Sequence, residues 1–201
     1  MSGQHTSHPL RCRCGALTGL VSQPRKASRG VCYCKDCQAF ARYLGNPDTV
    51  LDNMGGTDVV ATLAKYVSFT SGTDRLACLS LTDRGLLRWY ASCCRTPIGN
   101  TLRNFRVPYV GLVHTCLGTP AAIEASFGPV RMRVNTKSAT GHPKSMPLSQ
   151  AAALLRFLPT VLLGRLDGSY KTTPFFTVDG TPVVERKVLT SVELATVKNV
   201  V

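Results

Sequence analysis

The sequence predicts a mainly β protein that is stapled by zinc and carries a helical extension at its C-terminal end. Short runs of strand-forming residues, separated by Gly, Asn and Asp, occupy the chain up to about residue 135. Seven of the nine cysteines gather in three tight clusters in that same part. Beyond it, longer apolar stretches of helical composition replace the strand pattern. We therefore expect a zinc-binding β domain over residues 10–135 and an extension over 136–201, packed together as one domain.

The β-rich part contains one predicted helix, over residues 36–44, and Gly45 is placed to end it. Asp83–Gly85 is a predicted hairpin turn between two strands. The expected strands cover residues 16–22, 57–63, 65–70, 76–82, 86–91, 107–114 and 129–134.

The extension contains two predicted helices. The first covers residues 148–163, where Pro159 is expected to kink or split it. The second covers residues 190–198, and Thr190 with Glu193 forms a capping box at its start.

The charge and hydropathy of the sequence limit which classes of function it fits. Lysine and arginine number 24 against 11 acidic residues, a net charge of +13 that is spread evenly along the chain. Such a surface attracts anionic ligands and predicts at most weak, non-specific nucleic-acid binding, because basic and aromatic residues are not interleaved. The most apolar stretch, Ala151–Gly164, is interrupted by Arg156 and Pro159 and is shorter than the ~20 residues of a membrane span.

We therefore expect no membrane contact. The first ten residues contain no apolar run, so no secretory signal is expected, and the predicted location is cytoplasmic. Thiols stay reduced there, which favours metal ligands or catalytic thiols over disulfides.

The cysteine clusters are the strongest signal in the sequence. Thiolates on a C-x-C or C-x-x-C turn chelate one Zn²⁺ ion with little further ordering of the chain. Seven clustered cysteines can furnish one four-coordinate structural site and one three-ligand site that leaves a position for water or substrate. Spacing alone does not say which cysteines share an ion. Cys78 and Cys116 stand alone in apolar strands, where we expect buried free thiols. The three clusters are Cys12 with Cys14, Cys32 with Cys34 and Cys37, and Cys93 with Cys94.

The middle cluster is the expected place for chemistry. Cys34 and Cys37 bracket the start of the predicted helix. A helix N-terminus stabilises thiolate, as does a nearby cation such as Lys35.

The order of CRCG (Cys12–Gly15), CYCKDCQAFA (Cys32–Ala41) and CCRTPIG (Cys93–Gly99) resembles the glutathione-dependent formaldehyde-activating enzyme family, which includes centromere protein V. The family pattern is C-x-C-G, C-x-C-x-x-C and C-x-x-C-G-[ST]-P, and the resemblance covers roughly residues 10–135 in what looks like an uncharacterised bacterial branch. It implies a β-tent of antiparallel sheets stapled by zinc. It also implies carbon–sulfur lyase chemistry on a small thiol such as glutathione.

When the zinc ligands of the family are carried over residue by residue, the resemblance implies two zinc sites. Structural zinc is then held by Cys12, Cys14 and Cys94. Catalytic zinc is then held by Cys32, Cys34 and Cys37.

The third cluster departs from the family pattern in two ways. Ala91 stands where the first cysteine belongs, which leaves Cys93 as the nearby substitute, and Arg95 replaces the usual glycine. Consecutive side chains on a strand point to opposite faces, so Cys93 and Cys94 can bind one ion only if the chain turns sharply there.

Two function classes follow. One is an enzyme that forms or breaks a carbon–sulfur bond at the middle cluster; the other is a non-catalytic, zinc-stabilised module that binds nucleic acid or a protein partner. For the enzyme, candidates for contacting an anionic substrate are Asn100, Arg103, Asn104 and Arg106, with a solvated basic face as the alternative. The remaining notable side chains, expected to be structural, are His114, His142, Trp89 and Tyr90.

Overall fold

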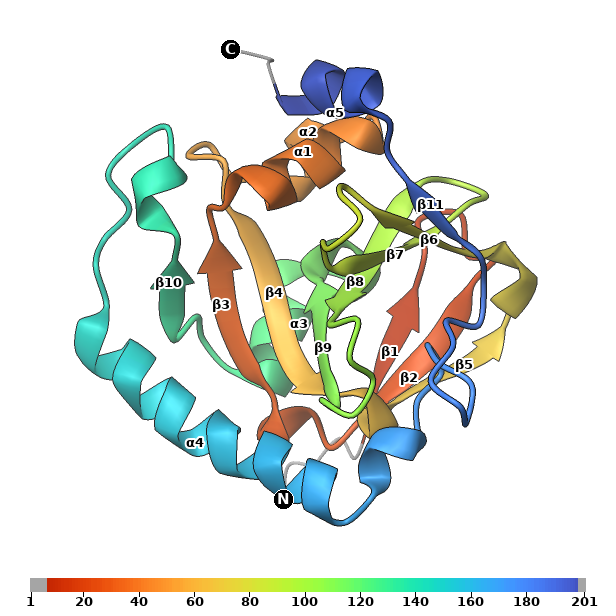
Figure 1. The fold of residues 1–201 in the computed structure, drawn as a ribbon. Coiled ribbons are helices and arrows are strands. Elements are labelled where there is room, and N and C mark those ends of the chain that lie inside the picture. The colour runs from red at the N-terminus through yellow and green to blue at the C-terminus, as the bar shows by residue number, and fades with distance from the viewer. Residues whose placement is uncertain (1–6, 199–201) are drawn as a thin grey trace.

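The computed structural model describes residues 7–198, and its strands form two sheets (Figure 1). The smaller sheet has the order β1-β2-β5, and the larger has the order β10-β3-β4-β9-β8-β7-β6-β11. The predicted mainly β fold is confirmed. The strands are β1 Ser7–Arg11, β2 Thr18–Ser22, β3 Ser28–Cys32, β4 Thr57–Leu63, β5 Val67–Ser71, β6 Leu76–Ser80, β7 Leu87–Ala91, β8 Thr96–Thr101, β9 Tyr109–Val113, β10 Met132–Val134 and β11 Arg186–Val188.

The larger sheet is antiparallel except at its two edges. There β10 pairs in parallel with β3, and β11 pairs in parallel with β6. Because β11 comes from the C-terminal extension, that extension completes the sheet as well as packing on it.

The core lies between the two sheets and includes an aromatic residue of the extension. Trp89 on β7 is fully buried, and its indole N–H donates to Thr101 Oγ1 at 2.9 Å. The Phe175 ring lies 5.1 Å from the Trp89 ring and 5.7 Å from that of Phe69 on β5. One extension side chain therefore contacts a strand of each sheet. Trp89, which the sequence predicted to be structural together with Tyr90, lies in this core.

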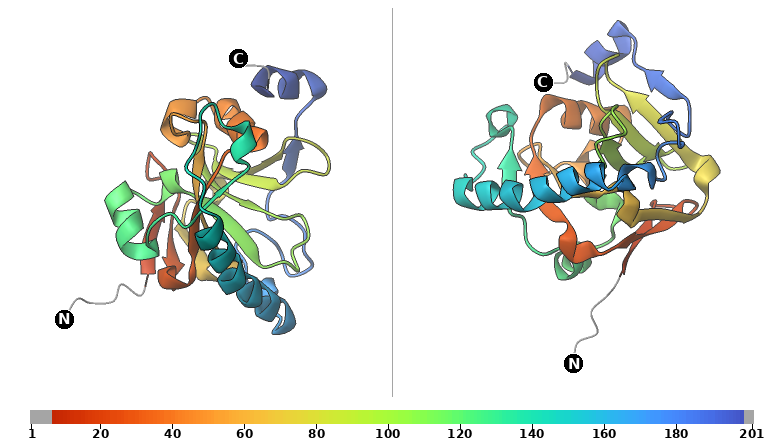
Figure 2. Two further views of the ribbon diagram at one scale, coloured as in Figure 1. Left: turned by 90° about the vertical axis from the view of Figure 1, so that its left-hand side faces the viewer. Right: turned by 60° about the horizontal axis from the view of Figure 1, so that its bottom comes forward.

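Helices cover the ends and the outside of this sheet pair (Figure 2). Local sequence signals set the bounds of two of these helices. Gly45, at φ 76°, follows α1. Before α5, the Thr190 N–H donates to the Glu193 carboxylate at 2.9 Å and the Glu193 N–H donates to Thr190 Oγ1 at 3.2 Å, which completes the capping box. The helices are α1 Lys35–Tyr43, α2 Pro47–Val50, α3 Pro120–Phe127, α4 Pro147–Leu166 and α5 Ser191–Lys198.

Helix α4 is longer than predicted and continues through Pro159. It runs along the outside of the molecule (Figures 1 and 2). By length and composition alone, it is the one helix among the described residues that is long and apolar enough to cross a membrane. The expectation of no membrane contact rested on a shorter apolar stretch, so the length of α4 removes that support.

Candidate metal centres

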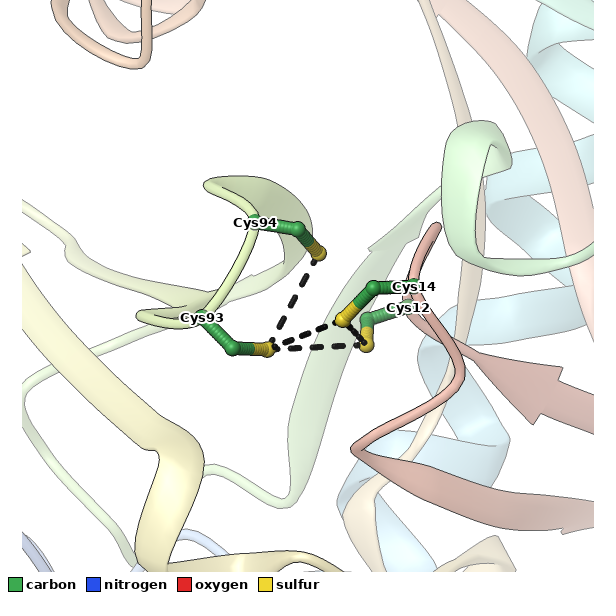
Figure 3. Close-up of side chains that lie close together, drawn as sticks. All are labelled: Cys12, Cys14, Cys93 and Cys94. Carbon is green, nitrogen blue, oxygen red and sulfur yellow. Dashed lines mark hydrogen bonds between the residues drawn. The ribbon is translucent and has the colours of Figure 1, made fainter.

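The first and third cysteine clusters meet in one place. Cys12 and Cys14 lie on the turn after β1, and Cys93 and Cys94 lie on the turn between β7 and β8 (Figure 3). The Sγ of Cys14 lies 3.5 Å from that of Cys12 and 3.4 Å from that of Cys93. The Cys12–Cys93 and Cys93–Cys94 sulfur distances are 3.8 and 3.9 Å. All four sulfurs lie within 4.8 Å of one another.

These distances fit a single tetrahedral ion. Zinc–sulfur bonds of about 2.3 Å place the corners of a tetrahedron ~3.8 Å apart. The four sulfur separations given above, from 3.4 to 3.9 Å, lie around that value. A disulfide needs about 2.05 Å, and all four cysteines are free thiols. This donor set can therefore hold a metal ion.

Short-range hydrogen bonds shape both turns. The buried Cys12 accepts the Gly15 N–H at its carbonyl (2.9 Å) and the Leu17 N–H at its sulfur (3.3 Å). Gly15 has φ 80°, which lets the chain reverse directly after the cysteines. On the other turn, Thr96 Oγ1 lies 3.1 Å from Cys94 Sγ. Although desolvation opposes it, this hydrogen bond and contacts with Cys14 lower the pKa of the Cys94 thiol to about 6.

The β7–β8 turn brings both Cys93 and Cys94 to the four-thiol cluster. Ala91 is fully buried at the end of β7, and Cys93 faces the other thiols from the turn itself. Arg95 has φ 57°, a left-handed conformation, and its N–H donates to the Ala91 carbonyl at 2.8 Å. The chain thus turns sharply at this point, and Cys93 and Cys94 both reach the cluster.

The middle cluster is built across a strand-to-helix junction. Cys32 ends β3, Cys34 is the N-cap of α1, and Cys37 lies in the first turn of that helix. The Cys37 N–H donates to Cys34 Sγ at 3.3 Å, and Asn135 Nδ2 donates to Cys32 Sγ at 3.4 Å. The three sulfurs lie within 4.8 Å of one another, so this donor set can also hold a metal ion.

The three thiols of the middle cluster differ in their pKa values. Hydrogen bonds from the Cys34 and Cys37 thiols lower the pKa of Cys32 to about 2. The same hydrogen bonds, followed by burial, raise the pKa values of Cys34 and Cys37 above their usual range. The cluster therefore carries one negative charge readily, and a metal ion that binds all three sulfurs would displace the protons of Cys34 and Cys37.

A cavity of about 270 Å³ opens beside the three thiols. Arg88 lines it with only 2% of its surface exposed, and its Nη1 donates to Asn100 Oδ1 at 3.1 Å. The same Nη1 lies 4.0 Å from Cys37 Sγ. Within residues 7–198, no carboxylate forms an ion pair with Arg88, so this buried cation faces the thiols and the cavity.

Tyr109 on β9 also lines the cavity. Burial, together with the nearby Cys37 and Cys32 thiols, raises the pKa of its phenol to about 12. The hydroxyl therefore stays protonated at neutral pH and can donate a hydrogen bond to a ligand.

The other sequence candidates divide between the cavity and the exposed basic face that was the alternative for them. Of the four polar residues after the third cluster, Asn100 alone lines this cavity, while Arg103 donates to the Asp83 carbonyl and Asn104 and Arg106 are exposed. Lys35 is exposed, and the buried cation at the thiols is Arg88, which the sequence analysis missed. The sequence does contain one indication of this residue: an arginine stands inside the apolar strand segment GLLRWYA. Arginine is seldom fully buried without a partner, so an arginine in such a segment is a candidate for a functional role.

The isolated cysteines are buried free thiols, as predicted. Cys78 and Cys116 are 2% and 0% exposed and belong to neither cluster. Burial raises the pKa of Cys78 to about 12 and that of Cys116 further, so both remain neutral.

The fold and the two donor sets define a mainly β protein with two cysteine centres that can hold metal ions. A family of unknown function, DUF6151, matches residues 5–187, and the chain belongs to this family. No curated protein matches the sequence. The function is therefore argued from the sites themselves.

Proposed function

We propose that the protein binds two zinc ions and that the centre at Cys32, Cys34 and Cys37 forms or breaks a carbon–sulfur bond in an adduct of a small thiol. The observation that carries this proposal is a three-thiol donor set beside a cavity of about 270 Å³. A four-thiol set closes a structural site, whereas a three-thiol set leaves a coordination position for a ligand. The resemblance of the cysteine clusters to the glutathione-dependent formaldehyde-activating enzyme family supports the same assignment.

A bound zinc ion would supply a Lewis-acidic position that favours the thiolate form of an incoming thiol. Around that position, the chain contributes a cation and two neutral polar groups. Arg88 offsets negative charge at the thiols and retains N–H donors for a carboxylate of the substrate. Asn100 fixes the Arg88 guanidinium, and the Tyr109 hydroxyl can donate to a carbonyl oxygen.

The reaction is a redox-neutral addition. The sulfur of the thiol forms a bond to the carbonyl carbon, the carbon–oxygen π bond breaks, and the thiol proton ends on the oxygen. Cleavage of the adduct is the reverse. A substrate carrying carboxylates, as glutathione does, suits both Arg88 and the net charge of +13.

Titration calorimetry of the zinc-loaded protein with glutathione tests the proposal. We expect one thiol to bind per chain in the wild type and none in Cys34→Ser, whose structural zinc and fold should remain. Cys78→Ala is the matched control, because this buried thiol lies outside both clusters. Equal binding by wild type and Cys34→Ser, or no binding of any small thiol by either, would leave a non-catalytic zinc-stabilised scaffold as the better account.

A further inference from the structure

The outer face of α4 carries an uninterrupted apolar stripe. Leu148, Leu155, Leu162 and Leu166 recur at spacings of seven, seven and four residues, which places them in one line along an α-helix. Leu158 and Leu163 widen the line on either side. All six side chains are between 58% and 86% exposed, so nothing in the described structure covers them.

Positive charge borders this stripe on both sides. At 100° per residue, Arg156 and Arg165 fall on opposite edges of the leucine face, and both are exposed. On the Arg156 side, α4 closes over a cavity of about 450 Å³. Arg25, Lys26 and Arg131 line this cavity with Arg156, and none of its lining residues is acidic.

The opposite face of α4 is fixed to the domain. Ala153 is buried, and Gly164 lies so close to Pro108 that an added Cβ would come within 3.1 Å of its ring. The Phe157 ring meets the Tyr109 ring edge-on at 6.1 Å. One face of α4 therefore packs on the protein while the other is apolar and bare.

We propose that α4 lies in the plane of an anionic phospholipid bilayer, with its leucine face in the acyl boundary and the flanking basic residues on the headgroup phosphates. An amphipathic helix with Lys and Arg beside a broad apolar face has this preference. Charge favours an anionic bilayer over a second copy of the chain as the partner of this leucine face. A second copy, with a net charge of +13, would bring like charges together along both edges of the stripe. Spanning the bilayer would require α4 to leave its contacts with Pro108 and Tyr109.

This placement would bring the membrane close to the thiol cavity. Phe157 on the inner face of α4 contacts Tyr109, and Tyr109 lines the cavity beside Cys32, Cys34 and Cys37. The proposal does not depend on the chemistry of that cavity, because it rests on the exposed leucines and on the charges that flank them.

Vesicle flotation of the full-length, zinc-loaded protein tests this inference. We expect binding to phosphatidylcholine vesicles that contain about one third phosphatidylglycerol, at least tenfold weaker binding to phosphatidylcholine alone, and loss of binding as salt is raised to about 0.5 M. Leu155→Glu/Leu162→Glu should lower binding at least tenfold with unchanged zinc content. Arg156→Gln/Arg165→Gln should lower binding to anionic vesicles only.

The matched control is Val178→Glu/Val192→Glu, which adds the same charge at exposed apolar positions outside α4 and should bind like the wild type. Equal loss in this control would overturn the proposal, because it would reflect net charge rather than α4. Absence of vesicle binding would also overturn it. So would a wild-type dimer in sedimentation velocity that Leu155→Glu/Leu162→Glu splits, because a second copy would then be the occupant.

Discussion

The Sγ of Cys93 lies 3.4 Å from the Sγ of Cys14, although 79 residues separate the two along the chain. Cys14 follows β1 of the smaller sheet, and Cys93 lies on the turn between two strands of the larger sheet. An ion held at this point joins the two sheets directly. Its binding free energy would then count as folding free energy, on the order of 10 kcal/mol.

Replacing Cys93 with Ser should remove the ion at the sheet junction. We expect one zinc fewer per chain and a destabilisation of several kcal/mol, because Cys93 lies close to all three other thiols and only three ligands remain without it. Metal analysis and thermal melting measure both effects. Cys116→Ala should keep the full zinc content and cost only about 1 kcal/mol. Undiminished zinc in Cys93→Ser would mean that the other three cysteines suffice.

The left-handed backbone conformation of Arg95 predicts that Arg95→Gly is more stable than Arg95→Ala. Both Arg95→Gly and Arg95→Ala lose the contact between the guanidinium and the Tyr43 ring, whose centroid lies 5.3 Å away. Only glycine relieves the strain at φ 57°. The glycine variant should therefore be more stable than the alanine variant by about 1 kcal/mol in paired denaturation curves of the zinc-loaded protein. Equal stability would show that the turn stores no backbone strain.

Arg88 should act on ligand affinity rather than on metal content. Arg88→Met removes the charge, and we expect glutathione binding to weaken by about 10- to 100-fold, the value of one charged hydrogen bond. Arg88→Lys keeps the charge and should lose less. Both variants should retain two zinc ions. If Arg88→Met binds glutathione as the wild type does, the arginine serves packing alone.

Loading the middle cluster with zinc should release protons. The pKa of Cys32 is lowered to about 2, so this residue is already a thiolate at neutral pH, whereas the pKa values of Cys34 and Cys37 are raised and both are protonated. Zinc needs all three as thiolates, so about two protons leave and the zinc affinity falls as the pH falls. Calorimetry in buffers of different ionisation enthalpy counts these protons. Zinc loading without proton release would contradict the assignment.

Elements with local signals were predicted accurately from the sequence. The strand at residues 57–63 and the helix that Gly45 follows agree with the structure to within a residue, and the capping box at Thr190 forms as expected. In each case the pattern that identifies the element lies within the element or directly beside it.

Elements held by distant partners were missed. The segment TPIGNT of β8 has the composition of a turn, yet all six residues are buried between β7 and β9. Gly99 is needed there because an added Cβ would come within 2.9 Å of the Gly111 carbonyl on β9. Strand β11 joins the sheet only through β6, more than a hundred residues earlier, and no local pattern reports that pairing.

The site was predicted as far as cysteine spacing allows. The sequence placed the thiols in clusters, but the use of Cys93 depended on the conformation of the turn at Arg95. Arg88 was missed because its role depends on which face of β7 meets the start of α1, and that is a tertiary relationship.

Zinc-edge X-ray absorption of the fully loaded protein, before and after glutathione is added, tests the central claim most directly. With one four-thiol and one three-thiol centre, the average zinc should have about 3.5 sulfur ligands. Glutathione should raise that average to about 4 in the wild type, whereas Cys34→Ser, which keeps only the four-thiol zinc, should give about 4 both before and after glutathione is added. In the wild type, an average of 4 before any thiol is added, or no rise afterwards, would contradict an open position at Cys32, Cys34 and Cys37.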